Sequence, residues 1–358
     1  MKSKVWVLPE AIGTGLDSIW EEPPPGLRYL AGHGEVIALV DIDSVSEVVG
    51  LSKDIKVPRG PLVVAAFGWE PPRRSAQFQL DLLTVHEDGS VGFADRVSAI
   101  EAEVLKQEFS RLATRSLTPK WGEGLIHGLV WEDGSLDLGC AEPKEIIGDL
   151  WNSGLPEGDG EVMLRMLIED SLNLFDGLEF NRRRADDGLP KLNLLWPHSF
   201  GFEPDLPNLA LRRGNVAQFW SGDIALEGMA KLVGYRHRER SGFYQGVHVS
   251  NKVRGGFLQE EGVSALFDER IGGHLCAKRG DEGRFSVEEW DRFVWEPMAL
   301  AIRSGEVIDG AILCPGSEGL GLIFGAAPNG VPFDGRGIGD SRLRKFRFGE
   351  VMAKLLGG

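Results

Sequence analysis

The side chains best suited to chemistry in this sequence are a few carboxylates and one histidine close to predicted strands. Glu10 follows the strand predicted at "KVWVLP", Asp41 and Asp43 lie in the segment "VDIDSVSEVV", and His198 follows the strand predicted at "LPKLNLLWP". A cleft carboxylate with a raised pKa can act as a general acid or base near neutral pH without a metal. The alternative is that Glu10 and Asp41 are solvated loop carboxylates and that His198 packs against its loop. Ser44 is a nearby hydroxyl, but it has no basic or metal-binding neighbour to activate it.

A glycine-rich stretch, from Pro315 to Phe333, follows the apolar run "GAILC" and is typical of a loop at the carboxyl end of a buried strand. Enzymes of the α/β class often place catalytic groups in such loops. This one has a single acid, Glu318, and no histidine. Its glycines could bring backbone amides close to a phosphate, but no helix pattern follows and the Gly-Lys-Ser/Thr of a P-loop is absent. We therefore interpret these glycines as space-filling.

The composition indicates a globular protein. The chain has 358 residues, of which 42% are hydrophobic and 26% charged, and this length is sufficient for two domains. No apolar run approaches the roughly 20 residues that span a bilayer, and the start has no long apolar signal segment, so we expect a cytoplasmic protein. The formal net charge of -15 disfavours nonspecific binding to nucleic acid or to anionic membrane. Basic clusters at residues 181–184, 211–214, 235–240 and 342–347 could serve an anionic ligand, or they could be solvated helix faces.

The hydrophobic pattern predicts strands separated by helices, which indicates βαβ units on a mainly parallel sheet. Strands are predicted at "KVWVLP", "GLIHGLVW", "LPKLNLLWP", "VAQFWSG" and "GAILC". Helices are predicted at "PGLRYLAGHG", "SAIEAEVLKQEFSRLAT", "DGEVMLRMLIEDSLNLF", "DIALEGMAKLVG", "SVEEWDRFVWEPMALAIRSG" and "RFGEVMAKLLGG". The segment "HEDGS" is a good hairpin connection between "FQLDLLTV" and "VGF". The middle of the chain therefore resembles a smaller α+β insertion.

Several stretches, taken in order, resemble the archaeal type of cofactor-independent phosphoglycerate mutase, in the alkaline phosphatase superfamily. They are "PPPGLRYLAGHGEV", "PRGPLVVAAFGWEP", "FQLDLLTVHEDGSV", "PKEIIG", the long block from Glu179 to Gly234, "EEWDRFVWEPM" and "GVPF". The likeness covers nearly the whole chain. It implies an alkaline-phosphatase-like α/β sandwich with a mainly parallel central sheet. The implied core domain is discontinuous, with residues 1–58 and 182–358, and residues 59–181 form the smaller inserted α+β domain.

Members of this family hold two divalent ions, usually Mn²⁺ or Zn²⁺, with carboxylates and histidines, and phosphorylate a serine transiently. Where the family has an Asp-Gly pair after the first strand, this chain has Glu10. Asp41 falls close to the position expected for the nucleophilic serine. The family's Asp-Glu-Ala-x-His motif is matched only by Asp281 and Glu282, without a histidine. The resemblance therefore implies that these parts of the metal site have changed.

The glycine-rich stretch shows the largest departure from the family. Gly316 and Ser317 align with an Asp-His pair of ligands, and Ala326 aligns with a third ligand histidine. Glycine and alanine side chains cannot hold a metal. We expect a divergent member that lacks most metal ligands and that has no metal cofactor.

Positions that contact the substrate in the family also differ. Gln79 replaces an arginine, His127 remains from a His-Arg pair, and Lys144 replaces the histidine of Asp-Pro-His. Lost arginines matter because they grip phosphate through paired hydrogen bonds. The remaining candidates for ligand binding are His127, Lys144, Arg182, Gly316, Ser317 and Glu318. The candidates left in the former catalytic cleft are Glu10, Asp41, Ser44 and His198.

Three functional hypotheses follow. The first is a pseudoenzyme that keeps the scaffold for binding, regulation or service as a partner subunit. The second is a metal-independent enzyme with changed chemistry on a small phosphorylated or carboxylated metabolite. The third is an active phosphoglycerate mutase. Concerted loss at separate positions favours the first, for which we expect a small anionic metabolite or a protein partner, possible oligomerisation, and no nucleic acid or membrane.

Overall fold

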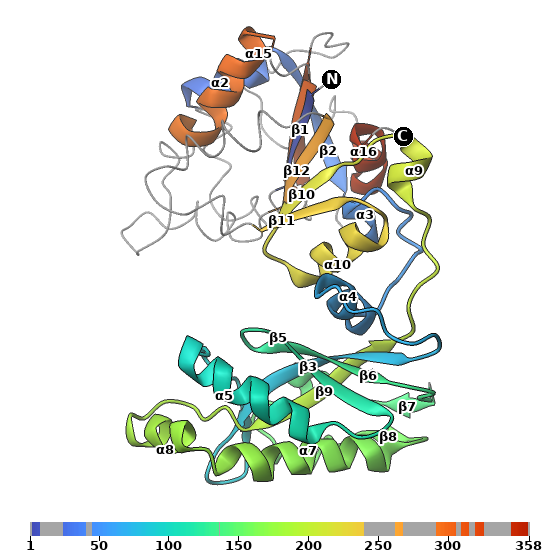
Figure 1. Cartoon of the computed structure of the whole chain (residues 1–358). Helices are drawn as coiled ribbons and strands as arrows, with labels where there is room; N and C mark the ends of the chain where they lie inside the picture. The colour runs from blue at the N-terminus through green and yellow to red at the C-terminus, as the bar shows by residue number, and fades with distance from the viewer. Residues whose placement is uncertain are drawn as a thin grey trace. The chain divides into compact units, whose positions relative to one another are not determined.

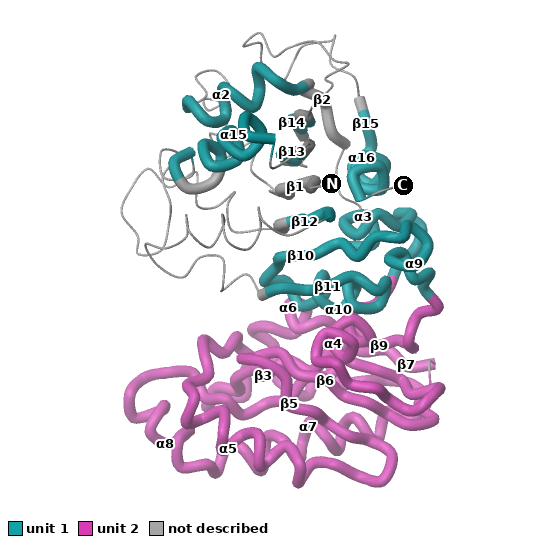
Figure 2. The backbone as a smooth tube through the Cα atoms, turned by 45° about the horizontal axis from the view of Figure 1, so that its top comes forward, with its two compact units in different colours: residues 1–56, 206–358 teal, residues 57–205 magenta. Residues whose placement is uncertain are grey.

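The computed structural model of the chain describes residues 2–7, 24–40, 45–135, 137–239, 262–267, 291–305, 309–314, 319–325 and 345–356. The chain divides into two compact units (Figure 2). Unit 1 contains Met1–Lys56 and Leu206–Gly358, and unit 2 contains Val57–Asp205. The division after Asp205 differs from the expected boundary at residue 181, which falls inside helix α8 (Glu179–Asp186).

Unit 1 is built on an eight-stranded sheet. Its strands, in spatial order, are β11 (Arg236–Glu239), β10 (Gln218–Ser221), β12 (Gly262–Phe267), β1 (Lys2–Val7), β13 (Asp309–Cys314), β14 (Gly319–Gly325), β2 (Gly34–Val40) and β15 (Lys345–Arg347). The run from β11 to β13 is parallel throughout, β14 is antiparallel to both neighbours, and β15 is parallel to β2. In unit 2 every pair of named strands is antiparallel, so antiparallel strand pairs are the more numerous over the two units together. A mainly parallel arrangement therefore holds for only part of the described sheet structure.

Helices cover both faces of the unit 1 sheet (Figures 1 and 2). On one face, α2 (Pro25–Gly32) packs against α15 (Glu296–Arg303), and on the other lie α3 (Val45–Val48) and α16 (Phe348–Leu355). The remaining described helices of this unit are α9 (Leu209–Arg213), α10 (Ile224–Leu232) and the π-helical turn η3 (Asp291–Trp295). Asp291 accepts hydrogen bonds of 3.0 Å from the backbone N–H groups of both Gly26 and Leu27. It thereby satisfies free donors at the start of α2, which has no side-chain cap of its own.

Unit 2 has a smaller antiparallel sheet around β3 (Ala76–Val85). This strand pairs with β4 (Val91–Gly92), β6 (Ile126–Trp131) and β9 (Leu194–Gly201), and β6 pairs with β5 (Leu117–Glu123). Strands β7 (Leu138–Gly139) and β8 (Glu157–Gly158) form a separate pair. Helix α4 (Arg59–Ala66) covers one face of the larger sheet, and α5 (Ala99–Phe109) and α7 (Glu161–Asp176) cover the other (Figure 1). The short elements η1 (Ser110–Leu112) and α6 (Pro143–Ile146) complete the unit together with α8.

The core of unit 2 follows from the alternation of β3. Phe78, Leu80 and Leu82 point to the face that packs against Phe109 of α5 and Leu164 of α7. Burying such side chains contributes about 1.5–3 kcal/mol each. The intervening residues lie on the opposite face, toward α4, and several of them are polar. This division of one strand into an apolar face and a polar face positions the site described below.

Local signals located several elements. The helix predicted at "SAIEAEVLKQEFSRLAT" is present as α5, and it begins with a capping box in which Ser98 and Glu101 exchange hydrogen bonds. The "HEDGS" hairpin is confirmed by the pairing of β3 with β4. Strand β9 was expected in the parallel core sheet, but it pairs antiparallel with β3, because an apolar strand does not specify its partner. Among the described helices, none is long and apolar enough to cross a membrane.

Candidate functional site

The strands that precede the expected catalytic loops share one direction. β1 and β13 are parallel, and β2 runs the same way because β14 is antiparallel to both β13 and β2. The carboxyl ends of these three strands therefore lie at one edge of the sheet, where α/β proteins commonly bind ligands. The candidates that follow these strands lie outside the described residues. They are Glu10, Asp41, Ser44, Gly316, Ser317 and Glu318.

A second group of polar side chains lies in unit 2, on the α4 side of β3. Gln79 and Asp81 come from β3, and His198 of β9 stands opposite Gln79 in the ladder. Glu142 precedes α6, and Ser199 follows His198 in β9. We call these five residues the His198 cluster. Tertiary pairing brings them together from three separate segments.

His198 lies between two carboxylates. The residue is 3% exposed. Its Nδ1 is 2.9 Å from Glu142 Oε2, and its Nε2 is 3.3 Å from Asp81 Oδ2. The second contact lacks the alignment of a hydrogen bond, since Nε2 has no hydrogen-bond partner among the described residues. The imidazole is therefore held by Glu142 on one side, with Asp81 close to its other nitrogen.

Ser199 has an uncommon backbone conformation. Its φ is 48°, in the left-handed region, and the β3–β9 register shifts between Gln77 and Gln79. Such an irregularity adds a residue to one strand and changes the direction of nearby side chains. Here the Ser199 hydroxyl donates to Glu142 Oε1 at 2.7 Å and lies 3.0 Å from His198 Nδ1. The strained backbone thus brings the hydroxyl beside the imidazole.

A chain of hydrogen bonds connects this cluster to α4. The Gln79 side chain donates from Nε2 to Asp81 Oδ1 at 2.7 Å. Its Oε1 accepts a hydrogen bond of 3.0 Å from Nε of Arg59, the first residue of α4. The position at which the family has an arginine is thus filled by an amide that holds Asp81 in place. The cation that this chain of hydrogen bonds reaches is Arg59, one side chain beyond Asp81 and Gln79.

The donor set of the cluster does not fit a metal ion. Metal sites need several donors that converge on one point. In the His198 cluster the carboxylates of Asp81 and Glu142 face opposite nitrogens of the ring. Across the described ranges of the chain, no group of three or more histidine, cysteine, aspartate or glutamate residues could hold a metal ion. The positions that align with the family's ligands in unit 1 lie outside those ranges.

His127, which we expected to contact a ligand, lies in the core of unit 2. It is fully buried, and its ring lies 4.3 Å from that of Trp121 and 4.8 Å from that of Phe109, measured between centroids. Its Nδ1 accepts a hydrogen bond of 3.1 Å from the Gly122 N–H. Burial lowers the pKa of His127 to about 3, although the charge of Asp81 acts in the opposite direction. The ring is therefore neutral at physiological pH, and its surroundings are those of a core residue.

The two predicted cationic ligand residues are on the surface. Lys144 of α6 is exposed. Arg182 of α8 has a 68% exposed side chain and forms a 3.6 Å ion pair with Glu179. Neither residue takes part in the His198 cluster. Of the predicted ligand residues, the three that the structure describes lie in different settings, with His127 in the core and Lys144 and Arg182 on the surface.

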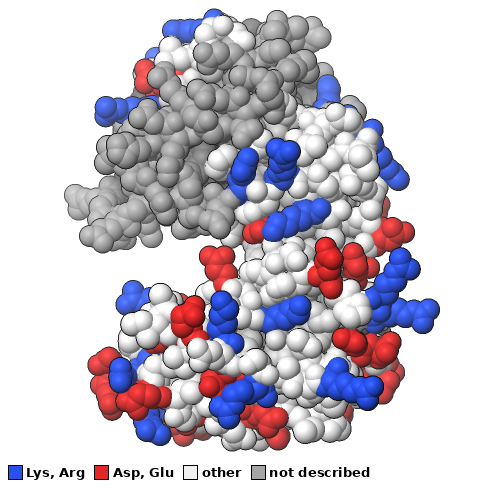
Figure 3. Space-filling view, in the orientation of Figure 1, with Lys and Arg blue, Asp and Glu red and all other residues white. Residues whose placement is uncertain are grey.

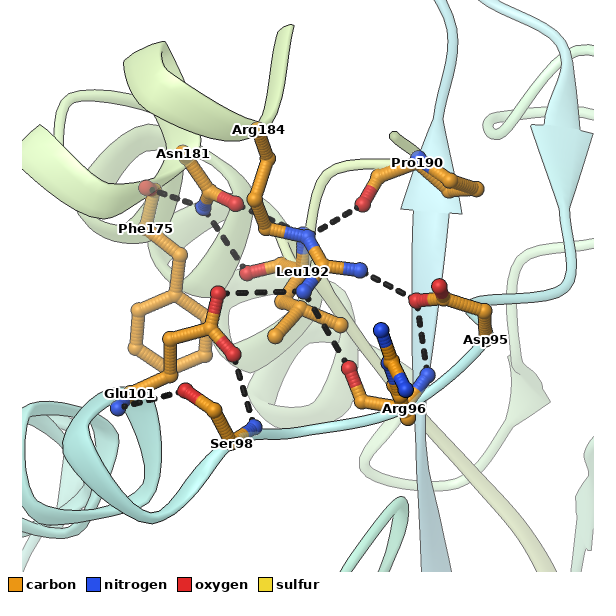
Figure 4. A network of polar contacts seen from close by, with 9 residues as sticks. All are labelled: Asp95, Arg96, Ser98, Glu101, Phe175, Asn181, Arg184, Pro190 and Leu192. Atoms are coloured by element: carbon orange, nitrogen blue, oxygen red, sulfur yellow. Dashed lines mark hydrogen bonds and ion pairs between the residues drawn. The ribbon is translucent and has the colours of Figure 1, made fainter. Parts of the chain in front are cut away.

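The neighbouring Arg184 is the centre of a separate buried network (Figure 4). Its guanidinium group pairs with Asp95 and, at 3.0 Å, with Glu101 Oε1. It also donates to the carbonyl oxygens of Pro190, at 2.6 Å, and Arg96, at 3.2 Å. The basic cluster at residues 181–184 thus contains a structural cation, which the sequence did not distinguish from its exposed neighbours.

Sequence reasoning selected His198 but did not select its partners. Asp81, Glu142 and Ser199 are separated along the chain, and no motif joins them. One signal was available, since Gln77, Gln79 and Asp81 are polar at alternate positions of an otherwise apolar strand. This period of two marks a polar face buried beneath another element.

Comparison with known proteins gives distant sequence relatives. No family model matches the chain. It is 24% identical over 258 residues to the 2,3-bisphosphoglycerate-independent phosphoglycerate mutase of Methanothrix thermoacetophila, a match that covers 69% of this chain and 64% of that protein. It is also 24% identical over 185 residues to a probable enzyme of the same name from Geobacter sulfurreducens, covering 49% of this chain and 46% of that protein. The matches therefore span less than two thirds of the length of these relatives.

Solved structures share the fold over nearly the whole chain. The cofactor-independent phosphoglycerate mutase of Thermoplasma acidophilum is similar with a TM-score of 0.55 and 17% identity, covering 99% of this chain and 100% of that one. A protein from Pyrococcus horikoshii is similar with a TM-score of 0.65 and 13% identity, covering 99% and 97%. At 17% and 13% identity, the structural similarity shows a shared fold and nothing more. Together with the sequence matches, they show that this chain is a divergent relative of the cofactor-independent phosphoglycerate mutases.

Proposed function

We propose that this chain is a pseudoenzyme, a binding or regulatory protein on the scaffold of a cofactor-independent phosphoglycerate mutase. It would not carry out that family's two-metal phosphoryl transfer. One support is the alignment of Gly316, Ser317 and Ala326 with metal-ligand positions. The other is the geometry of the His198 cluster in unit 2.

The observation that carries the proposal is that this cluster pairs its charges internally. Asp81 Oδ1 accepts a hydrogen bond from the Gln79 side chain, and Asp81 Oδ2 lies next to His198. Glu142 Oε1 accepts a hydrogen bond from the Ser199 hydroxyl, and Glu142 Oε2 lies next to His198. The cluster thus contains two acids and no lysine or arginine, and Arg59 reaches it only through the amide of Gln79. It therefore offers a phosphorylated substrate none of the paired guanidinium donors that bind phosphate well.

The expected partner is a small anionic metabolite bound away from this cluster, or a protein. On the face of unit 2 shown in Figure 3, acidic and basic side chains are interspersed, with no continuous basic surface. Together with the net charge of -15, this disfavours nucleic acid and membrane surfaces as partners. A cytoplasmic location and self-association are part of the same proposal.

A coupled enolase assay tests it. The purified chain, with Mn²⁺ or Zn²⁺, is given 3-phosphoglycerate, and the Methanothrix thermoacetophila relative serves as the positive control. We expect no interconversion above background and no retention of two metal ions in native mass spectrometry. Activity that disappears with chelator would overturn the proposal and support an active mutase.

A second candidate is a metal-independent enzyme that acts on a small phosphorylated or carboxylated metabolite. The specific observation is the series Asp81, His198 and Ser199, an acid, an imidazole and a hydroxyl with left-handed backbone. Such a series can activate a hydroxyl as a nucleophile. Glu142 competes with His198 for that hydroxyl, which is why we rank this candidate second.

A metabolite screen followed by mass spectrometry separates the two candidates. Turnover that is lost in Ser199→Ala and His198→Asn, but kept in the matched surface control Ser110→Ala, would establish the second candidate and contradict the first. A screen without turnover contradicts the second.

A further inference from the structure

A cavity of about 710 Å³ lies in unit 2, on the other side of the β3–β9 irregularity from the His198 cluster. It is lined by residues 72–75, which lead into β3, by residues 202–205, which follow β9, and by Gln77 of β3 itself. Small-molecule sites commonly have volumes of roughly 300–1,000 Å³. This cavity is therefore large enough for a metabolite. None of the five residues of the His198 cluster lines it.

Gln77 is the polar group that the cavity leaves without a partner. The residue is only 3% exposed. Its neighbour on the same face, Gln79, has both amide groups engaged, whereas the Gln77 side chain has no hydrogen bond to any described residue. The polar atoms of Gln77 are not among the fully enclosed, unpartnered atoms of the described residues, so its amide is open toward the cavity that it lines. Gln77 presents a donor and an acceptor side by side, and a ligand edge with an acceptor and a donor would satisfy both.

Two arginines at the mouth of the cavity are free to bind an anion. Arg73 and Arg74 are exposed, and neither has an ion pair or hydrogen bond from its side chain to the part of the chain that the structure describes. Arg74 also has a φ of 66°, in the left-handed region that non-glycine residues seldom adopt. Strained backbone of this kind is concentrated at ligand sites. Guanidinium groups bind phosphate through paired hydrogen bonds.

The other wall supplies a ring and two acids. Phe202 is 37% exposed although it is a large apolar residue, so its ring is available for stacking. Glu203 and Asp205 are exposed beside it. Two arginines and two carboxylates give the lining no net charge, which makes it a poor site for a bare anion. The carboxylates suit hydroxyl groups, such as those of a ribose.

We propose that this cavity binds an adenine nucleotide. The planar base stacks on Phe202, and its amino group and ring nitrogen pair with the amide of Gln77, the pairing that glutamine makes with adenine. The phosphate lies at Arg73 and Arg74, and the ribose hydroxyls face Glu203 and Asp205. The inference is independent of the lost mutase chemistry, so either proposal can fail without the other.

Calorimetric titration of the full chain with adenosine monophosphate is the test. We expect saturable binding, weakened about tenfold or more by Gln77→Leu and by the nearly isosteric Gln77→Glu. Arg73→Ala should also weaken binding and reduce its salt dependence. Arg111→Ala, which removes a 64% exposed arginine outside the cavity, is the matched control and should have no effect. Circular dichroism melting curves check that each variant is folded.

The competing ligand is inorganic phosphate, titrated under the same conditions. We expect it to bind much more weakly than the nucleotide and to be insensitive to Gln77→Leu. The proposal is overturned if adenosine monophosphate does not bind. It is also overturned if phosphate binds equally well, or if both Gln77 variants bind the nucleotide as the unchanged chain does.

Discussion

The two buried polar networks of unit 2 differ in the charge that they enclose. Around Arg184, a permanent cation with a 5% exposed side chain meets two carboxylates and two backbone carbonyls. Burial would raise the pKa of Glu101, but hydrogen bonds from Ser98 and Arg184 outweigh it, so the pKa is lowered. The backbone N–H of Arg96, and then Arg184, lower the pKa of Asp95. Cation and anions are thus kept ionised by one another.

Around His198 the central group is an imidazole and not a permanent cation. The side chains of Asp81 and Glu142 are 21% and 39% exposed, while that of His198 is 4% exposed. The acids of the Arg184 network are exposed to a similar extent, 38% for Asp95 and 13% for Glu101, so the two networks differ in the group at their centre. The comparison teaches that a network built on a permanent cation should contribute more to stability than one built on an imidazole. Three predictions test this difference, and a fourth concerns the buried His127.

The largest effect is expected at Arg184. Replacing it in Arg184→Met leaves two carboxylates and two carbonyl oxygens without their cation, and should lower the free energy of unfolding by about 3–5 kcal/mol. Urea-induced unfolding measures this. Arg183→Met, on the same helix with a 74% exposed side chain, should change stability by no more than about 0.5 kcal/mol. A small effect at Arg184 would mean that its network is not structural.

The next effect concerns His127, a buried imidazole without a carboxylate in hydrogen-bond contact. Its folded pKa, about 3, is below that of an unfolded histidine, so the unfolded state takes up the proton first. The stabilisation is complete above about pH 6.5 and is lost as the pH falls toward 3. Between pH 6 and 4.5 this amounts to about 2 kcal/mol.

Urea unfolding at these two pH values measures the effect. Carboxylates begin to titrate in the same range, so the contribution of His127 is the difference in pH dependence between the unchanged chain and a variant without the ring. In His127→Leu the pH dependence should be smaller by that amount, whereas in His86→Gln, an exposed histidine, it should stay the same. An unchanged pH dependence in His127→Leu would show that this ring is protonated in the folded state.

His198 should have an intermediate effect on stability. His198→Leu leaves Asp81 and Glu142 facing an apolar group, at a cost of about 1–3 kcal/mol in the free energy of unfolding. His33→Leu, at an exposed position, is the control and should cost less than about 0.5 kcal/mol. A loss as large as that for Arg184→Met would make the two networks equivalent, and the comparison would fail.

The smallest effect is expected at Ser199. Both Ser199→Ala and Ser199→Gly remove the hydroxyl, but only glycine accepts a φ of 48° without strain, so the glycine variant should be more stable by about 0.5–1 kcal/mol. Ser110, whose φ is -65°, is the control position. There Ser110→Ala should be more stable than Ser110→Gly, because alanine is favoured in helical backbone. Thermal melting of the four variants gives both differences. If the alanine variant were the more stable one at both positions, the backbone of Ser199 would not be strained.

The elements that sequence predicted best were those specified locally. The turn after β3 lies within the five residues "HEDGS", and the helix α5 lies within one periodic segment. The resemblance also identified the scaffold, since the fold is shared with a solved mutase structure. The end of unit 2 was misplaced, because the apolar strand β9 has the composition of a core strand of either sheet. Its partner is set by tertiary pairing with β3.

By itself, the sequence determined the longer periodic helices, the hairpin turn after β3, the distant family and the presence of His198 next to an apolar run. Only the tertiary structure decided that Asp81 and Glu142 face its two nitrogens, that Arg184 is buried beside exposed arginines, and that Gln77 lines a cavity. The physical reason is one of range. Capping and periodicity act within a few residues, whereas burial and the pairing of charges depend on which distant segments pack together.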